Sequence, residues 1–443
     1  MTMTHVFSSG VKEVFRLRLA SGREVTASAN HPFLTLDGWQ PLAELAVGTR
    51  LSVPRRLPAP IETRVWPEAE VVMLAHMIGG GSSVRRRPIR FTSDDEANLA
   101  AVTQAAKHFG VTAIREEHTA ARVATLRLPA PPRLTHGKRN PIAAWLDGLG
   151  LLGLRSHEKF VPDEVFGLTD DQVVLFLRHL WATDGCVSWD EENGRARLYY
   201  ASTSRRLVDG VTRLLGRVGI MSRIKVTRQG AHGVGYQLHV TGLDDQARFA
   251  ERVGCHGARG ESLTACASEL TSRKADTHLD TIPPQIWDRV RTTLREEETT
   301  YREFASASGT GFRGGAQCRT APGRARLARV AEVLDDADLE LLCTNDVFWD
   351  EVVAIESLGR QEVFDATVPG THNFVADGVN VHNSIEQDAD MVILLYREDA
   401  YDQESPRAGE ADIIVAKHRN GPTADVTVAF QGHYSRFVDM APG

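Results

Sequence analysis

Residues 363–384 read VFDATVPGTHNFVADGVNVHNS, and this stretch constrains the fold more than any other in the chain. Residues 363–367 and 373–376, bounded by turn residues, read as two short strands. A turn at Pro369–Thr371 would join them, and a tight turn at Asp377–Gly378 would lead into a third strand that ends in His-Asn-Ser. We therefore expect a β-rich domain that carries this tripeptide at the end of a hairpin.

The tripeptide has a specific chemistry. The side-chain amide of Asn383 can attack its own main-chain carbonyl, because the ring that forms has five members and the attack is intramolecular. The peptide bond to Ser384 would then break. His382 is placed to protonate the leaving amine or to polarise the carbonyl, and the hydroxyl of Ser384 can accept an acyl group.

The whole segment resembles the C-terminal splicing motifs of inteins, in which a Tyr/Phe-Asp strand, a Thr-His-Asn-Phe turn and a final His-Asn precede Ser, Thr or Cys. The resemblance implies acid/base and orienting roles for Asp365 and His372, cyclisation by His382 and Asn383, and Ser384 as the first residue of the flanking host protein. It also implies an all-β, horseshoe-like Hint domain made from both ends of the intein, which needs no cofactor.

The N-terminal region agrees with this interpretation. Residues 13–19 and 24–29 alternate around Ser21–Gly22, which predicts a hairpin. The following SANHPF resembles the second N-terminal splicing motif of inteins, with Ser28 where Thr is commoner and His31 as the histidine that activates the upstream scissile amide. Imidazole suits that role because its ordinary pKa lies near neutral pH.

The first splicing motif is missing. Inteins begin with a Cys or Ser nucleophile upstream of this histidine, whereas this chain begins Met1-Thr2-Met3-Thr4 and its first cysteine is Cys186. Without that nucleophile the first acyl shift has no attacking group. We expect complete splicing only with an N-terminal intein and helicase segment, supplied in cis or in trans, while cyclisation of Asn383 can still release the C-terminal part.

The composition sets limits on the class of protein. A length of 443 residues allows about three domains, and 42% hydrophobic and 25% charged residues describe a soluble protein. The net charge of −7 gives no general attraction to nucleic acid, so DNA contacts would need local basic patches. Five scattered cysteines without CxxC spacing favour a reducing compartment, and no apolar run reaches ~18 residues. We expect a cytoplasmic protein without membrane contact.

Two stretches inside the chain, MLAHMIGGG at 73–81 and LRHLWATDG at 177–185, have helical apolar spacing and end in glycine. They resemble the paired helices of LAGLIDADG homing endonucleases, which implies an α/β domain that binds DNA and holds Mg²⁺ between two carboxylates. Asp184 supplies one carboxylate and metal ligand, but Gly80 occupies the place of the other. We therefore expect double-strand cleavage to be weak or absent.

Other residues of this insertion are weaker candidates. SHEKFVP at 156–162 resembles the lysine-containing motif before the second helix, so Lys159 is a candidate helper of the active-site base, and Lys225 is a second. The basic runs 85–90 and 223–228 suit contacts to DNA phosphates. Lysines and basic runs of this kind are more often solvated surface charges.

Residues 384–443 resemble the C-terminal end of the RecA-like α/β motor domain of DnaB-type replicative helicases, which act as homohexamers on DNA. The resemblance places Gln387 in a DNA-sensing motif and makes Lys417 and Arg419 the pair that reaches the γ-phosphate of a neighbouring subunit. The sequence contains no GxxxxGK[ST], so ATP and Mg²⁺ would be used only by a complete helicase. We expect one buried strand at 391–395 and two more strands after it.

The sequence predicts a multidomain α+β protein. A helical segment before the last β-rich part is either a helix-turn-helix-like DNA-binding appendage or a spacer. Two other interpretations stay open for the chain: an ATP-dependent replicative helicase, and a free-standing homing endonuclease or DNA-binding regulator. The expected domains are the N-terminal Hint part at 1–56, the endonuclease domain at 57–275, the helical segment at 276–340, the C-terminal Hint part at 341–383 and the helicase fragment at 384–443.

Overall fold

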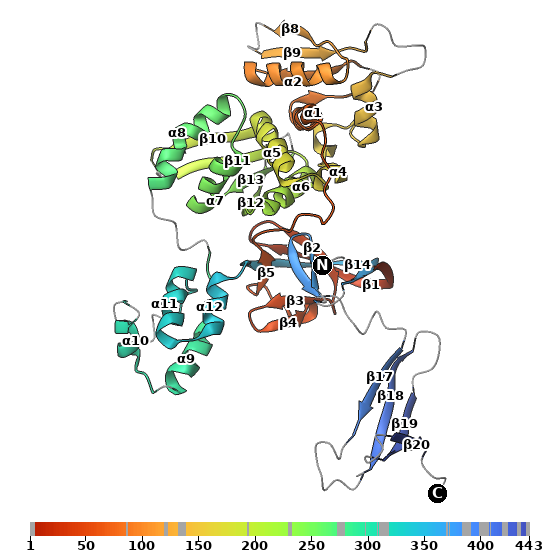
Figure 1. Ribbon diagram of the computed structural model, residues 1–443, viewed down its shortest axis with the longest axis vertical. Helices are drawn as coiled ribbons and strands as arrows, with labels where there is room; N and C mark the ends of the chain where they lie inside the picture. Colours follow the sequence, from red (N-terminus) through yellow and green to blue (C-terminus); the bar gives the residue numbers. More distant parts are fainter. Residues whose placement is uncertain are drawn as a thin grey trace.

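Two long strands from opposite ends of the chain pair with each other in the computed structural model. Strand β1 (His5–Leu19) runs antiparallel to β14 (Val347–Thr367), from the pair His5 and Thr367 to the pair Leu19 and Val352. The structure describes residues 5–85, 87–118, 123–131, 139–192, 195–228, 233–272, 280–296, 298–307, 309, 319–368, 371, 373–382, 391–397, 407, 409–418, 424–431 and 436–439. Figure 1 shows β1, β5 and β14 together in the middle of the molecule.

Two four-stranded sheets form this β-rich unit, whose core includes Leu17, Phe33, Leu51, Val352 and Val381. The first has the order β2-β1-β14-β5, and the second has the order β15-β16-β3-β4. The short strands are β2 (Glu24–Ser28), β3 (Pro32–Thr35), β4 (Gly38–Pro41), β5 (Arg50–Pro54), β15 (Asn373–Ala376) and β16 (Val379–His382), with a 3-10 turn at Leu42–Glu44.

Both predicted hairpins are confirmed. Strands β1 and β2 flank the Ser21–Gly22 turn, and β15 and β16 flank Asp377 and Gly378. Asp377 has φ 49° and Gly378 has φ 80°, the left-handed pair of values that a two-residue turn between twisted strands requires. This turn pairs Asn373 with His382, so it fixes which residue ends the hairpin.

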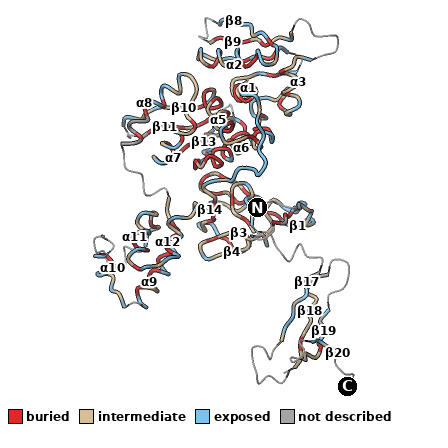
Figure 2. The backbone as a smooth tube through the Cα atoms, viewed as in Figure 1, coloured by how far each residue is buried: buried red, intermediate tan, exposed pale blue. Residues whose placement is uncertain are grey.

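The insert between β5 and the helical unit, residues 57–272, contains two helices that pack against each other, α1 (Glu68–Ile78) and α5 (Asp170–Asp184). They correspond to the two predicted helices. A Cβ atom on Gly79 would overlap the side chain of Thr183, so glycine allows the two helix ends to approach closely. Buried residues of the insert form one continuous core, which Figure 2 shows in red.

Each helix of this pair is followed by a four-stranded antiparallel sheet, with the orders β6-β7-β9-β8 and β10-β11-β13-β12. The strands are β6 (Gly81–Ser82), β7 (Ile89–Ser93), β8 (Ile114–His118), β9 (Val123–Leu128), β10 (Gly185–Asp190), β11 (Arg195–Ser202), β12 (Ser222–Arg228) and β13 (Val234–Val240). The other helices are α2 (Glu96–His108), α3 (Pro141–Gly148), α4 (Asp163–Phe166), α6 (Arg205–Arg217), α7 (Leu243–Arg248) and α8 (Ala258–Ser272), with short turns at Ser156–Glu158 and Phe249–Val253.

The helical unit has its own core around Trp287, Leu327 and Leu339. It consists of α9 (Ile286–Glu296), α10 (Tyr301–Ala307), α11 (Arg324–Leu334) and α12 (Ala337–Thr344). The boundary predicted between residues 340 and 341 is wrong, because α12 continues to Thr344 and packs against α11. Asp336 caps α12 by accepting hydrogen bonds from the main-chain amides of Asp338 and Leu339. This cap was not predicted from the sequence.

The C-terminal segment forms a meander of β17 (Met391–Tyr396), β18 (Glu410–His418), β19 (Ala424–Gln431) and β20 (Arg436–Asp439). Three strands follow β17, not the two that we predicted. The prediction that 391–395 is a buried strand is also wrong, because Ile393 is 50% and Leu395 is 60% exposed. No element of the described chain covers these two side chains. Among the described residues no helix is both long and apolar enough to cross a bilayer.

Three histidines lie in the interface between α1 and α5. His76 Nε2 is 3.1 Å from His179 Nδ1, and the ring centroids of His179 and His256 are 4.4 Å apart. Burial is the main cause that lowers the pKa of His179 to about 3 and the pKa of His76 well below its usual value, and the neighbouring histidines add to both shifts. His76 and His179 therefore stay neutral in the folded insert.

Acidification should destabilise the insert. As the pH falls below the ordinary histidine pKa of about 6.5, the unfolded chain binds protons on His179 that the folded chain does not bind. This one residue should cost about 1.4 kcal/mol per pH unit, or about 2 kcal/mol at about pH 5. Urea unfolding of the insert, followed by hydrogen exchange in α5, measures this slope.

The variant His179→Asn keeps a polar atom near the position of Nδ1 and should give a shallower slope. The matched change of the exposed His157 to Asn should leave the slope as it is. Equal slopes for the original chain and His179→Asn would contradict this account.

Candidate functional site

A cavity of about 260 Å³ lies where β1, β2, β14, β15 and β16 meet. His31 and Asp365, which the sequence predicted as functional residues, both line it. Lys12 and Ser9 of β1 line it as well, with Lys12 Nζ 2.7 Å from Ser9 Oγ. Two predicted residues separated by more than 300 positions therefore share one small space, because β1 and β14 are paired.

His31 lies in the turn before β3, where its main-chain amide donates to the carbonyl of Ser28 at 3.0 Å. Its ring is half-buried and meets the ring of Phe33 edge to face, with centroids 5.6 Å apart. Burial, then the positive charges of His382 and Lys12, lower the pKa of His31 to about 4. The imidazole is thus neutral at pH 7, and His31 does not keep the pKa near neutrality that is usual for histidine.

Asp365 is 5% exposed and lies near the end of β14. Its carboxylate accepts a hydrogen bond from the main-chain amide of Ala366 at 2.8 Å. The short strand on the other side of the cavity ends in His382, whose ring stands edge to face on Trp39 with centroids 4.9 Å apart. Strand β16 also pairs with β3 through Val381 and Phe33, and Val381 lines the cavity with His31, whereas His382 is not among the lining residues.

Several site residues lie outside the described residues or were not predicted. His372, Asn383 and Ser384 are not among the described residues. Sequence reasoning missed Lys12 and Trp39, because no motif marks them and only their places in β1 and β4 bring them to the site.

A second cavity of about 260 Å³ lies at the ends of α1 and α5, and Asp184 and Lys159 both line it. Burial raises the pKa of Asp184, while the positive charges of Lys159 and Arg259 act in the opposite direction. Tyr200 Oη donates to Asp184 Oδ2 at 3.5 Å. Lys225 does not line this cavity; it is exposed on β12.

Lys159 caps the end of α1. Its Nζ donates to the carbonyls of Met77 at 3.0 Å, Ile78 at 2.9 Å, Gly79 at 3.3 Å and Gly81 at 2.7 Å. These carbonyls carry the negative end of the helix dipole, which favours a cation there. Burial lowers the pKa of Lys159 to about 8, and Asp184 opposes this shift.

The residues of this cavity do not suit the predicted site, in which Mg²⁺ is held between two carboxylates. A Cβ atom on Gly80 would lie 3.0 Å from both the Phe91 ring and the Thr92 carbonyl, so a carboxylate at this place would need its neighbours to move. Within the described ranges no group of three or more His, Cys, Asp or Glu side chains could hold a metal ion. Asp184 alone gives Mg²⁺ one charged ligand in this cavity.

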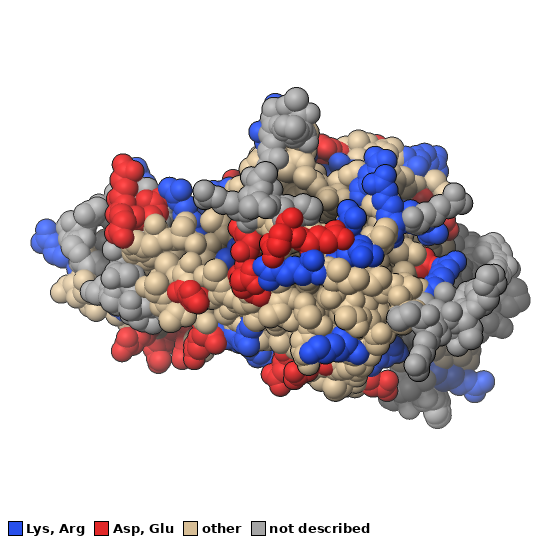
Figure 3. Space-filling view, turned by 90° about the horizontal axis from the view of Figure 1, so that it is seen from above, with Lys and Arg blue, Asp and Glu red and all other residues tan. Residues whose placement is uncertain are grey.

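Basic side chains are exposed on or next to both sheets of the insert. Arg223 and Lys225 are exposed on β12, and Arg90 is exposed on β7, whereas Arg85 and Arg87 precede β7. On the face seen in Figure 3, Lys and Arg lie among Asp and Glu. Local phosphate contacts therefore suit this surface better than a general attraction to polyanions.

The helicase-like residues are only partly described. Lys417 lies in β18, in register with Val392 of β17, while Gln387 and Arg419 lie outside the described residues. The structure thus describes the strands of this segment, whereas the contact of Lys417 and Arg419 with a γ-phosphate stays a prediction.

Two domain families match segments of this chain. Residues 171–254 match a LAGLIDADG-like domain, and residues 375–439 match the DnaB-like helicase C terminal domain. The first match covers α5 from its second residue and the sheet β10-β11-β13-β12; the second begins within β15 and contains β16 and the meander.

Known relatives match the chain over very different lengths. The replicative DNA helicase DnaB of Nostoc sp. is 40% identical over 444 residues, which is 99% of this chain and 50% of that protein. Protein RecA of Mycobacterium tuberculosis is 29% identical over 407 residues, 85% of this chain and 50% of that protein. DnaB of Leifsonia xyli subsp. xyli is 76% identical over 59 residues, 13% of this chain and 13% of that protein. The chain thus spans about half the length of the relatives that it matches along most of its own length.

The substitution Asp184→Asn should raise the thermal stability of the insert. A carboxyl whose folded-state pKa is raised destabilises the folded state once the pH exceeds its ordinary value of about 3.9, and a neutral amide removes that cost. Calorimetry at about pH 7 should give a higher midpoint, and the difference should shrink toward about pH 4.

The matched substitution of the exposed Glu192 to Gln should leave the midpoint unchanged. A lower midpoint for Asp184→Asn at neutral pH would mean that the positive charges of Lys159 and Arg259 and the hydrogen bond from Tyr200 outweigh the cost of burial.

Proposed function

We propose that this chain is an intein segment of a replicative DNA helicase, in which a Hint-type splicing domain carries a LAGLIDADG-type insert with impaired nuclease activity. The observation that carries the proposal is the pairing of β1 with β14, which brings His31 and Asp365 into one cavity beside the hairpin that ends in His382. Asn383 and Ser384 follow directly in the sequence.

The reaction proceeds at the bond after Asn383. The side-chain nitrogen of Asn383 attacks its own main-chain carbon, and the bond between that carbon and the nitrogen of Ser384 breaks. His382 delivers a proton to the leaving amine. The products are residues up to 383 ending in a succinimide and a C-terminal piece beginning with the free amine of Ser384.

His31 and Asp365 serve the upstream half of splicing. A neutral imidazole donates its N–H to the carbonyl or amide of the upstream scissile bond, and its low pKa keeps it in that form at pH 7. Asp365 accepts and returns protons in the same cavity. The nucleophile for the first acyl shift comes from an N-terminal intein and helicase segment, acting in cis or in trans.

The pattern of similarity supports an insertion into a host protein. One DnaB protein matches 99% of the chain, whereas another matches 59 residues, about the length of the stretch that follows Asn383. Protein RecA matches 85% of the chain, so at least part of the similarity lies outside that C-terminal stretch and is shared by two differently named proteins. A transferable element explains this pattern better than a helicase domain does.

Two other functions have less support. ATP-dependent unwinding needs a Walker phosphate loop, which the sequence lacks, although the complete host would use ATP and Mg²⁺ as a hexamer on DNA. A free-standing homing endonuclease would not account for a splicing hairpin followed by a helicase-like segment. We assign the Lys417 and Arg419 pair and Gln387 to the restored helicase.

Expression of this chain should yield a slow loss of residues 384–443 when Asn383 cyclises. Intact mass spectrometry should show the loss, a succinimide on the larger piece, and no loss for Asn383→Ala. His382→Ala should slow the release by about 10²-fold or more, because it removes the proton donor. An unchanged mass for the original chain after prolonged incubation would contradict C-terminal cleavage by this chain alone.

The insert should bind DNA that spans the uninterrupted helicase insertion site without cutting both strands. One carboxylate at the helix ends gives too little negative charge to hold the metal ions for cleavage. Electrophoretic mobility shifts test binding, and incubation with Mg²⁺ tests cleavage, with Asp184→Asn as the control. Efficient double-strand cleavage would overturn this use of Gly80.

A further inference from the structure

We infer that Arg213, in helix α6 of the insert, is a positioning residue for the splice junction, because it holds the turn of the hairpin whose far end is His382. This inference rests on the proposed splicing function and adds to it a role for the nuclease-like insert. Three sets of contacts link the insert to the β-rich unit at or near this turn.

The first contact is direct. Arg213 Nη2 lies 2.7 Å from Asp377 Oδ1, and the two side chains are 47% and 48% exposed. Asp377 is the first residue of the turn between β15 and β16, and it has φ 49°, a left-handed value that costs energy for a residue other than glycine. The ion pair thus restrains a residue whose conformation sets the register of β16.

The second contact lies beneath the same turn. Arg23, at the start of β2, is 6% exposed, and its guanidinium donates to the carbonyl of Ser222 in the insert at 3.3 Å. A Cβ atom on Gly378 would lie 3.2 Å from Arg23 Nε, so the turn rests on this side chain. The buried carboxylate of Asp350 supplies the charge that compensates Arg23. Arg23 therefore joins the turn, β14 and the insert.

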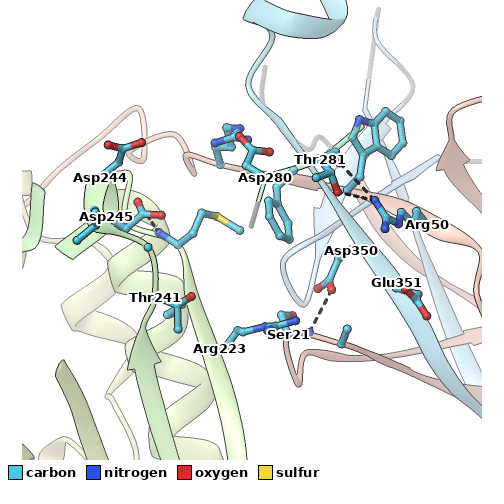
Figure 4. Close-up of a pocket in the computed structure, with 18 of the residues that line it drawn as sticks. Ser21, Arg50, Arg223, Thr241, Asp244, Asp245, Asp280, Thr281, Asp350 and Glu351 are labelled. Carbon is cyan, nitrogen blue, oxygen red and sulfur yellow. Dashed lines mark hydrogen bonds and ion pairs between the residues drawn. The ribbon is translucent and has the colours of Figure 1, made fainter. Parts of the chain in front are cut away.

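The third contact lets the β1–β2 turn dock on the open edge of the sheet β10-β11-β13-β12. The amide of Ile224 donates to the carbonyl of Ser21 at 2.7 Å, and Ser21 donates its own amide to Asp350 Oδ1 at 3.1 Å. Figure 4 shows this region beside a cavity of about 310 Å³ that the β-rich unit, the insert and Asp280 surround. A Cβ atom on Gly22, which has φ +81°, would overlap the Ile224 carbonyl, so glycine is required at this contact.

Through these contacts the insert restrains the hairpin. Ser204, the N-cap of helix α6, donates its hydroxyl to the carbonyl of Lys159 at 2.6 Å. Lys159 in turn caps α1 at the nuclease-like cavity. The ends of α1 and the splice hairpin are therefore connected through α6 and one ion pair, Arg213 with Asp377.

The test is a double-mutant cycle with two readouts. Arg213→Ala and Asp377→Asn each remove the ion pair, and Asn tolerates the left-handed conformation at 377. Release of residues 384–443 should slow by about two- to fivefold in each single variant, the range that an exposed ion pair supports. The double variant should be no slower than either single variant.

The second readout does not need cleavage. In an Asn383→Ala background, hydrogen exchange at the amides of Val379 and Val381 should accelerate by a similar factor when Arg213 is replaced by Ala. Arg213→Lys should restore most of the protection and of the rate, because it keeps the charge. Added salt at about 1 M should bring the original chain close to the Arg213→Ala values.

The control is Arg115→Ala, which removes another exposed ion pair of the insert, with Glu96, away from the hairpin. It should change neither readout. If the original chain releases nothing, the proposed cleavage fails, and the exchange measurement alone decides the inference. If Arg213→Ala leaves exchange at Val379 and Val381 as it is in the original chain, the inference is wrong whether or not cleavage occurs.

Discussion

The antiparallel pairing of β1 with β14 is the constraint on which the rest of the chain depends. It joins residues 5–19 to residues 347–367, so every element between them must leave and return at the same place. The entropy of closing so long a loop grows slowly with its length, and a folded insert with its own core reduces the disorder further. The two β-rich ends can therefore form one unit, while the insert and the helical unit fold around their own apolar clusters.

The insert is nevertheless held to the β-rich unit by more than its two chain connections. Its helix α6 and the edge of β12 contact the β1–β2 turn, the start of β2 and the β15–β16 turn through hydrogen bonds and through the ion pairs of Arg205 with Glu24 and of Arg213 with Asp377. Contacts of this kind mean that the insert and the β-rich unit restrain each other. These contacts lie on a different part of the insert from the cavity at the ends of α1 and α5. A change in that cavity therefore need not alter them.

Local patterns predicted the local elements well. The β-favouring residues of 373–382 and the Asp-Gly pair predicted a hairpin whose bounds the structure reproduces, because turn chemistry and strand propensity are both short-range properties. The same reasoning could not foresee that Lys159 caps α1, since that contact joins residues some eighty positions apart. It also misjudged Ile393 and Leu395, because an apolar run records what a strand can bury and says nothing about which neighbour is present. The ring of His31 kept its predicted place but not its expected pKa, since burial became visible only in three dimensions.

Arg23 has a consequence for anyone who shortens this chain to its β-rich unit. Its guanidinium is buried among groups from both the β-rich unit and the insert, with Ser222 supplying the carbonyl that accepts its hydrogen bond. Excision of the insert would remove that acceptor and expose the guanidinium to water, which would then have to solvate it. In a compact engineered derivative Arg23 would become a surface residue, and the turn at Gly378 that packs on its side chain would lose the support that the insert gives.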